Sequence, residues 1–249
     1  MHYIYKLAIY SLLITIVIVV FINMYIENEM NEYEKNAINT DELYKICKTG
    51  DLIYFRWPTP DIGFRLFSKF SHIGMVYKKS DDEVYILETH PEGDGSELGV
   101  EDGGVHLYNL KDRLNKYYGY CYLAKSNTAN QTANYVTKHI KENLDRYKNI
   151  PFDEGFRYTF VKSCFTKLDY PVEETTPMCC SQFIGFILKE LDVLHDHYNI
   201  FNFSPTSFID LKYNDKLLYD NNILKIIKDE EEDDDEEDEE DEKEIINNK

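Results

Sequence analysis

Several residue types are scarce in this 249-residue chain, and each shortage excludes a class of protein. Only 11 glycines and 7 prolines are present, which excludes a collagen-like chain and a chain dominated by flexible linkers. Five cysteines are too few for a small scaffold held together by disulfides. Lysine and arginine number 27 against 46 acidic residues, and the chain outside residues 229–244 is still mildly acidic, so we expect no nucleic acid as a partner.

Apolar side chains and acidic charge, by contrast, are abundant. Hydrophobic residues make up 43% of the chain and aromatic residues 14%, which is enough for a packed core. The net charge of −19 is concentrated in residues 229–244, which hold 15 acidic residues and one lysine. Like charges in a block repel one another and stay solvated, which predicts a disordered acidic tail over 228–249. The alternative is a weak site for cations or for a basic partner.

One long apolar run lies near the N-terminus, from Leu7 to Ile26, and contains no charged residue. Twenty helical residues span about 30 Å, the hydrocarbon thickness of a bilayer. A cleaved signal peptide is the competing interpretation, but no small-residue cleavage site follows the run. The chain is therefore expected to comprise a membrane anchor (1–26), a polar linker (27–44), one folded domain (45–227) and the acidic tail (228–249).

The charges that flank the apolar run indicate its direction. Lys6 precedes the run, whereas Glu27, Glu29 and Glu32 follow it. By the positive-inside rule, this predicts a single-pass protein with a cytosolic N-terminus and a domain on the non-cytosolic side. An odd number of cysteines leaves at least one thiol free, and a free thiol is best tolerated in a reducing compartment. The two indications of compartment point in opposite directions.

The domain has strand patterns first and helix patterns later. Five short segments rich in β-branched and aromatic residues are expected to be strands: 51–55, 72–77, 84–88, 105–108 and 118–124. Apolar residues at helical spacing predict helices over 132–147 and 181–194. Consecutive strands with short connections favour an antiparallel sheet, and the helices that follow give an α+β fold.

Cys180 stands at the predicted start of the second helix, after Pro177 and Cys179. The free N–H groups of a helix N-terminus stabilise a thiolate, lower the pKa of a cysteine there, and can bind a developing oxyanion. These are the needs of a cysteine nucleophile. The bland interpretation is a buried structural thiol, since free cysteine is among the most buried residue types. Cys180 abuts the predicted helix start and is the better candidate of the two adjacent cysteines. If Cys180 is the nucleophile, Cys179 points elsewhere or acts as a redox neighbour.

A cysteine nucleophile needs a base, and His72 is the preferred candidate among seven histidines. It opens a short apolar strand and shares one strand face with Gly74, which leaves space beside the imidazole. Glu88 ends the next predicted strand and is positioned to orient the base, with His90 as the alternative orienter. The non-catalytic interpretations are that His72 is a core histidine with its hydrogen bonds made and that Glu88 is a surface glutamate. His195 and His197 form a pair without a third ligand near in sequence, so no metal site is expected.

Seven short segments follow one another between residues 45 and 212: Gly50-Asp-Leu-Ile-Tyr-Phe, Ser71-His-Ile-Gly-Met-Val, Tyr85-Ile-Leu-Glu, Gly104-Val-His-Leu-Tyr-Asn-Leu, Ile150-Pro-Phe-Asp, Cys180-Ser-Gln-Phe and Ser204-Pro-Thr-Ser-Phe. This order resembles the circularly permuted papain-like amidases, the YiiX/YaeF-type branch of the NlpC-type superfamily. Lecithin retinol acyltransferase and a poxviral group are distant members of that family. In the family, the histidine strand precedes the cysteine helix, as His72 precedes Cys180 here.

The resemblance implies a thiol nucleophile at Cys180, a general base at His72 and an orienting acid at Glu88, with no cofactor. Three positions depart from the family pattern, since Gln182 replaces a glutamate, Cys179 a frequent aromatic residue and Phe152 a tyrosine. These departures concern the substrate pocket rather than the nucleophile or the base.

The expected function is a thiol hydrolase or acyltransferase that acts on an amide or ester through a covalent acyl-enzyme. Its acyl substrate is a peptide, an isopeptide or a lipid. The alternative is a catalytically inactive, membrane-anchored structural or partner-binding module of the same fold. A redox protein that uses Cys179 and Cys180 is a third and less favoured interpretation, because a vicinal disulfide closes a strained ring.

Overall fold

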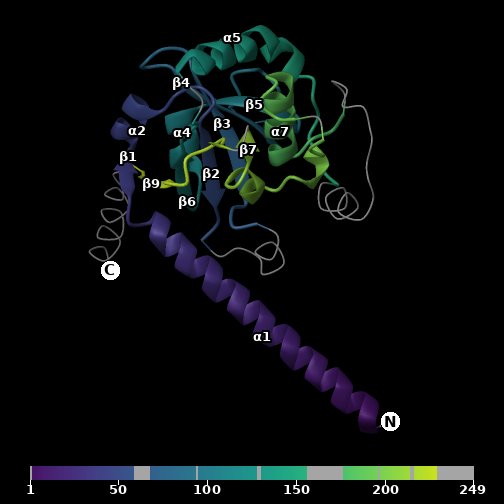
Figure 1. Cartoon of the computed structure of the whole chain (residues 1–249). Helices are drawn as coiled ribbons and strands as arrows, with labels where there is room; N and C mark the ends of the chain where they lie inside the picture. Colours follow the sequence, from purple (N-terminus) through teal and green to yellow (C-terminus); the bar gives the residue numbers. More distant parts are fainter. Residues whose placement is uncertain are drawn as a thin grey trace, which may run out of the picture.

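The computed structural model describes residues 2–58, 68–93, 95–127, 130–155, 176–195, 197–213 and 216–228. In the described ranges, one seven-stranded sheet forms the centre of the domain, in the order β1-β9-β6-β2-β3-β4-β5 (Figure 1). The strands are β1 (Ala37–Asn39), β2 (Leu52–Arg56), β3 (His72–Lys78), β4 (Val84–His90), β5 (Gly104–Asn109), β6 (Tyr120–Ala124) and β9 (Leu224–Ile227). A separate two-stranded sheet joins β7 (Lys212–Tyr213) to β8 (Lys216–Leu217).

The five predicted strands are confirmed as β2 to β6, and all of their pairings are antiparallel. Their high content of β-branched and aromatic residues suits a sheet covered on both faces. The other described strands, β1, β7, β8 and β9, were not predicted, because each has only two to four residues. β1 and β9 pair in parallel at the sheet edge, which brings the two ends of the domain together.

Helices cover both faces of the sheet. The larger core contains Tyr54, Tyr122 and Phe183 and lies on the side of α5 (Asn130–Tyr147) and α7 (Cys180–Glu190). The smaller core contains Phe55 and Leu114 and lies on the side of α2 (Thr40–Ile46) and α4 (Leu110–Lys116). Short 3₁₀ turns, η1 (Ile200–Asn202) and η2 (Pro205–Phe208), follow α7. The predicted α+β class is confirmed.

The predicted linker over 27–44 is wrong. Helix α1 runs without interruption from His2 to Tyr33, and β1 and most of α2 occupy the rest of the segment. Ile26 and Met30 are 6% and 1% exposed because they pack into the larger core. Three of the charged residues that suggested a linker form ion pairs with the domain: Glu27 with Arg56 at 2.7 Å, Glu29 with Lys69, and Glu34 with Lys225. The domain therefore begins inside α1.

The N-terminal part of α1 extends away from the domain (Figure 1). Its Tyr5–Tyr33 portion is long and apolar enough to cross a membrane by length and composition, and its most apolar window is 0% buried. This agrees with the predicted anchor. The predicted acidic tail lies outside the described residues from position 229 onward.

Candidate active site

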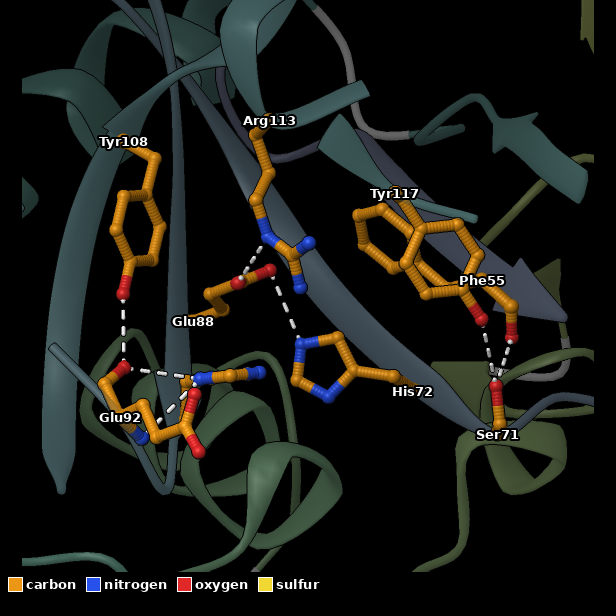
Figure 2. A network of polar contacts seen from close by, with 9 residues as sticks. Phe55, Ser71, His72, Glu88, Glu92, Tyr108, Arg113 and Tyr117 are labelled. Carbon is orange, nitrogen blue, oxygen red and sulfur yellow. Dashed lines mark hydrogen bonds and ion pairs between the residues drawn. The ribbon is translucent and has the colours of Figure 1, made fainter. Parts of the chain in front are cut away.

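His72 and Glu88 meet at the end of the sheet where β3 begins and β4 ends. The imidazole Nε2 lies 3.0 Å from Oε2 of Glu88 (Figure 2). Gly74 makes room for this contact, since a Cβ there would stand 2.5 Å from Cδ1 of Ile86 and 3.1 Å from Oε2 of Glu88. The second ring nitrogen, Nδ1, faces away from Glu88 and makes no hydrogen bond with any described residue (Figure 2). One ring nitrogen is thus held against Glu88, and the other has no hydrogen bond among the described residues.

Arg113 completes the row of polar groups and was missed by the sequence reasoning. Its Nε donates a hydrogen bond of 2.7 Å to Oε1 of Glu88. Helix α4 supplies this arginine, and Asn109 caps the helix by accepting hydrogen bonds from the N–H groups of Lys111 and Asp112. The guanidinium also lies over the ring of Phe55, at 4.9 Å from the centroid. A buried glutamate on an apolar strand needs a cationic partner, so the position of Glu88 in the sequence indicated that such a partner exists but not which residue it is.

The electrostatics of this row keep Glu88 ionised. Its side chain is 0% exposed, and burial alone would raise its pKa. The positive charge of Arg113, together with the contact to His72, outweighs burial and brings the pKa of Glu88 to about 2. A charged carboxylate at this distance holds the adjacent imidazole in one orientation.

His90, the alternative orienter, does not take that place. Its ring centroid lies 6.0 Å from that of His72, and the two rings are perpendicular. Its Nδ1 is instead occupied locally, at 2.9 Å from the carbonyl oxygen of Glu92. Burial lowers the pKa of His90. Glu88 is therefore the group that contacts the candidate base.

Cys180 is the first residue of α7, and its sulfur lies against β3. The backbone N–H of Ile73, the residue after His72, is directed at the Cys180 sulfur. This approach is open because the described pairing of β3 with β4 ends at Met75, so the two strands separate toward His72 and Glu88. The structure thus brings the cysteine helix to the histidine strand. No hydrogen bond between the Cys180 thiol and the His72 imidazole is present among the described residues.

The expected lowering of the Cys180 pKa is wrong for this arrangement. Its contact with the Cys179 side chain, followed by burial, raises the pKa of Cys180 well above the ordinary value. The same contact with Cys180, together with Ser181 and the Gln182 N–H, lowers the pKa of Cys179. Cys179 is the N-cap residue of α7, so the backbone N–H of Gln182 in the first helical turn adds to the effect of the Cys180 thiol.

The first turn of α7 contains a further buried amide. Oε1 of Gln182 accepts a hydrogen bond of 3.0 Å from the N–H of Cys179. Nε2 of the same side chain is buried and has no hydrogen-bond partner in the described part of the chain. Ser181 fixes the turn by donating a 2.6 Å hydrogen bond to the carbonyl oxygen of Phe203. An unused donor therefore lies one turn from the two thiols.

A pocket of about 730 Å³ borders the start of α7. Its walls come from the loop after β4, the loop before β5, and residues near 152 and 177, and five of its lining residues are acidic: Glu92, Glu101, Asp102, Asp153 and Glu154. Phe152 bridges to Met178, which ties this wall to the cysteine pair. Phe152, a position where the chain departs from the family pattern, is among the residues that line this pocket.

Metal-binding clusters of three or more His, Cys, Asp or Glu side chains do not occur in the described ranges. His195 and His197 stack on each other, with ring centroids 5.6 Å apart. Cys47, Cys121, Cys179 and Cys180 are free thiols.

Comparisons with known proteins add a distant similarity of fold. No family model and no curated protein match the chain. Among solved structures, the chain is similar to the crystal structure of metalloprotein yiiX from Escherichia coli O157:H7, with 16% sequence identity and a TM-score of 0.37. The match covers 58% of this chain and 66% of that protein, which is less than two thirds of its length.

Proposed function

We propose that this chain is a membrane-anchored thiol hydrolase or acyltransferase with a circularly permuted papain-like fold. One observation carries the proposal. A buried row of Arg113, Glu88 and His72 orients an imidazole at the end of β3, and the sulfur of Cys180 rests against the backbone of the next residue, Ile73. A nucleophile, a base and an orienter in this order are the components of thiol-based acyl transfer.

Cys180 is the proposed nucleophile, rather than Cys179, because of where each sulfur makes its contacts. The contacts of Cys179 are with Cys180, Ser181 and Gln182, all within its own helix turn. Cys180 instead contacts the strand that carries the base. Since the pKa of Cys180 is raised, the sulfur attacks as a thiol that loses its proton to His72 while the carbon–sulfur bond forms.

In the first half-reaction, the sulfur adds to the carbonyl carbon of an amide or ester, and the thiol proton moves to His72. The imidazolium then protonates the leaving amine or alcohol as its bond to carbon breaks, which leaves a thioester on Cys180. In the second half-reaction, His72 takes a proton from water for hydrolysis, or from an amine or hydroxyl for acyl transfer, while that acceptor bonds to the acyl carbon. The carbon–sulfur bond then breaks, and the imidazolium returns the proton to the Cys180 sulfur as the acid, amide or ester leaves. Backbone N–H groups at the start of α7 and the Gln182 amide are the donors for the oxyanion.

The proposed location of the enzyme is a membrane, with α1 as a single-pass anchor. In this location the acyl group belongs to a lipid, a peptide or an isopeptide. The acidic tail over 228–249 is proposed to have weak affinity for cations or a basic partner.

A second candidate is a catalytically silent, membrane-anchored module of the same fold. The raised pKa and the low exposure of Cys180, 9%, favour it, because both properties slow the attack of a thiol. The two candidates differ in whether the thiol reacts with an acyl electrophile.

The test is labelling of the full chain with an acyl-directed electrophile at neutral pH, followed by mass-spectrometric mapping of the modified cysteine. The proposed enzyme is labelled on Cys180, and Cys180→Ser abolishes the label while Cys179→Ser retains it. Cys47, whose pKa burial raises to about 12, is the internal control for an inert thiol. Labelling no faster at Cys180 than at Cys47 would establish the silent module.

A further inference from the structure

The contacts of α1 with the domain determine which part of the domain lies at the end of the apolar run. That run ends at Ile26, and the next residue, Glu27, forms a 2.7 Å ion pair with Arg56 at the end of β2. One turn later, Glu29 is paired with Lys69. The side chain of Arg56 is only 7% exposed, so this junction is part of the packed domain rather than a loose hinge. The end of β2 therefore lies at the level where the apolar run ends.

Exposed aromatic side chains gather at this level. Trp57 follows Arg56 directly and is 51% exposed. Tyr118 and Tyr120 are 86% and 40% exposed, and Tyr120 is the strand partner of Arg56. Gly119 between them packs so tightly that a Cβ there would stand 2.5 Å from the carbonyl oxygen of Arg56. With Tyr25, which is 66% exposed on α1, these residues form what we name the aromatic rim: Tyr25, Trp57, Tyr118 and Tyr120.

The composition of the aromatic rim fits one partner, the headgroup layer of a phospholipid bilayer. Tryptophan and tyrosine concentrate at membrane–water interfaces because each has an apolar body and a polar end. Lysines accompany the rim, with Lys69 5.9 Å from the ring centroid of Tyr25 and Lys225 4.9 Å from that of Tyr120. Both lysines are also ion-paired with residues of α1 or the residue that follows it, Lys69 with Glu29 and Lys225 with Glu34, so the fit to the headgroup layer rests on the aromatic side chains.

We propose that the aromatic rim lies in the headgroup layer of the membrane that α1 crosses and holds the domain against the bilayer surface. This inference rests on the membrane-spanning role of α1 in the proposed function. It has a consequence for the candidate site, since Phe55, two residues before Trp57, is the strand partner of His72. Two strand residues span about 7 Å, so the rim places the candidate base close to the lipid surface.

The chain provides its own probe, because Trp57 is its only tryptophan. The experiment reconstitutes the full chain into phosphatidylcholine vesicles, with or without bromine on the upper part of the acyl chains, and compares tryptophan emission. The matched control is the double variant Trp57→Phe/Tyr135→Trp. Tyr135 is 51% exposed on α5, and α1 leaves the domain on the side opposite α5 (Figure 1). Flotation after alkaline extraction reports separately whether α1 is inserted.

With α1 inserted, the proposal predicts blue-shifted emission from Trp57 that brominated lipid quenches about twofold or more, and unquenched emission from position 135. If α1 is inserted but brominated lipid quenches Trp57 no more than the tryptophan at position 135, the proposal of the aromatic rim is refuted, whereas the role of α1 as an anchor is retained. Equal quenching at both positions also overturns it, because the domain then has no defined membrane face. Failure of α1 to insert removes the anchor from the proposed function and the rim with it.

Discussion

Replacement of Arg113 by methionine tests whether this arginine keeps Glu88 ionised inside the domain. Methionine preserves the apolar stem that packs near Phe55 but removes the donor that lies 2.7 Å from Oε1 of Glu88. Glu88 is 0% exposed, so the variant leaves a buried carboxylate whose remaining charged partner is His72. We expect the variant to lower stability and to raise the pKa of Glu88.

The size of the effect follows from two independent magnitudes. Removal of one partner from a buried ion pair costs about 3–5 kcal/mol. The depression of the Glu88 pKa from 4.5 to about 2 corresponds to about 3 kcal/mol of net stabilisation of the ionised form. Arg113→Met is therefore expected to reduce the free energy of unfolding by about 3–5 kcal/mol. For a domain of this size, that lowers the melting temperature by about 10 °C.

The assay is equilibrium unfolding of the full chain in detergent, in a double-mutant cycle with Glu88→Gln. Because the double variant leaves no unpaired charge in the core, Glu88→Gln should cost at least about 2 kcal/mol less in the Arg113→Met background than in the wild type. Lys35→Met is the control, since Lys35 pairs with Glu32 through side chains that are 65% and 58% exposed and its loss should cost less than about 1 kcal/mol. Equal costs for Arg113→Met and Lys35→Met, or a coupling energy of zero, would refute the reasoning.

Three further predictions follow from the same structure. The folded-state pKa of Glu88 lies below its unfolded value of 4.5, so the stability it contributes is complete above about pH 4.5 and is lost as pH falls toward 2; acid titration of unfolding should show a drop of about 3 kcal/mol in this window that Glu88→Gln removes. Gly74→Ala should slow labelling of Cys180 and destabilise the domain by about 1–3 kcal/mol, because its Cβ would overlap Ile86 and crowd Glu88; Gly155→Ala, whose Cβ meets nothing closer than 3.4 Å, is the control, and equal behaviour of the two would contradict the crowding argument. Met30→Ala should cost about 2–4 kcal/mol in thermal or denaturant unfolding, whereas Met24→Ala, at a position 64% exposed, should cost almost nothing; similar costs would contradict the packing of α1 into the core.

Local pattern was sufficient for most of the sheet and for the pairing of His72 with Glu88. Glu88 ends the strand that follows the histidine strand, which indicated that a hairpin brings the two together, and a glycine beside the histidine indicated free space. Arg113 could not be identified in the same way, because its role depends on how α4 folds back over β4. That return is a tertiary event with no periodic signature.

The linker over 27–44 was mispredicted for a related reason. Its glutamates are typical of a solvated segment. In the structure, however, Glu27 and Glu29 form ion pairs with Arg56 and Lys69, which are distant in sequence. The sequence of a helix does not indicate whether a charged side chain on it is solvated or forms an ion pair with a distant residue. The pKa of Cys180 was misjudged because a helix N-terminus was considered alone, whereas the neighbouring thiol of Cys179 decides how the charge is shared.

The most direct test of the central claim, that His72 activates Cys180, is the rate at which an acyl-directed electrophile labels Cys180 in the wild type and in His72→Ala. General-base catalysis by a positioned histidine contributes about 10²–10⁴ in rate, so the variant should be labelled at least about a hundredfold more slowly at neutral pH. Intact thermal unfolding of His72→Ala would show that the domain remains folded. Equal labelling rates for Cys180 in the two folded proteins would contradict the assignment of His72 as the base.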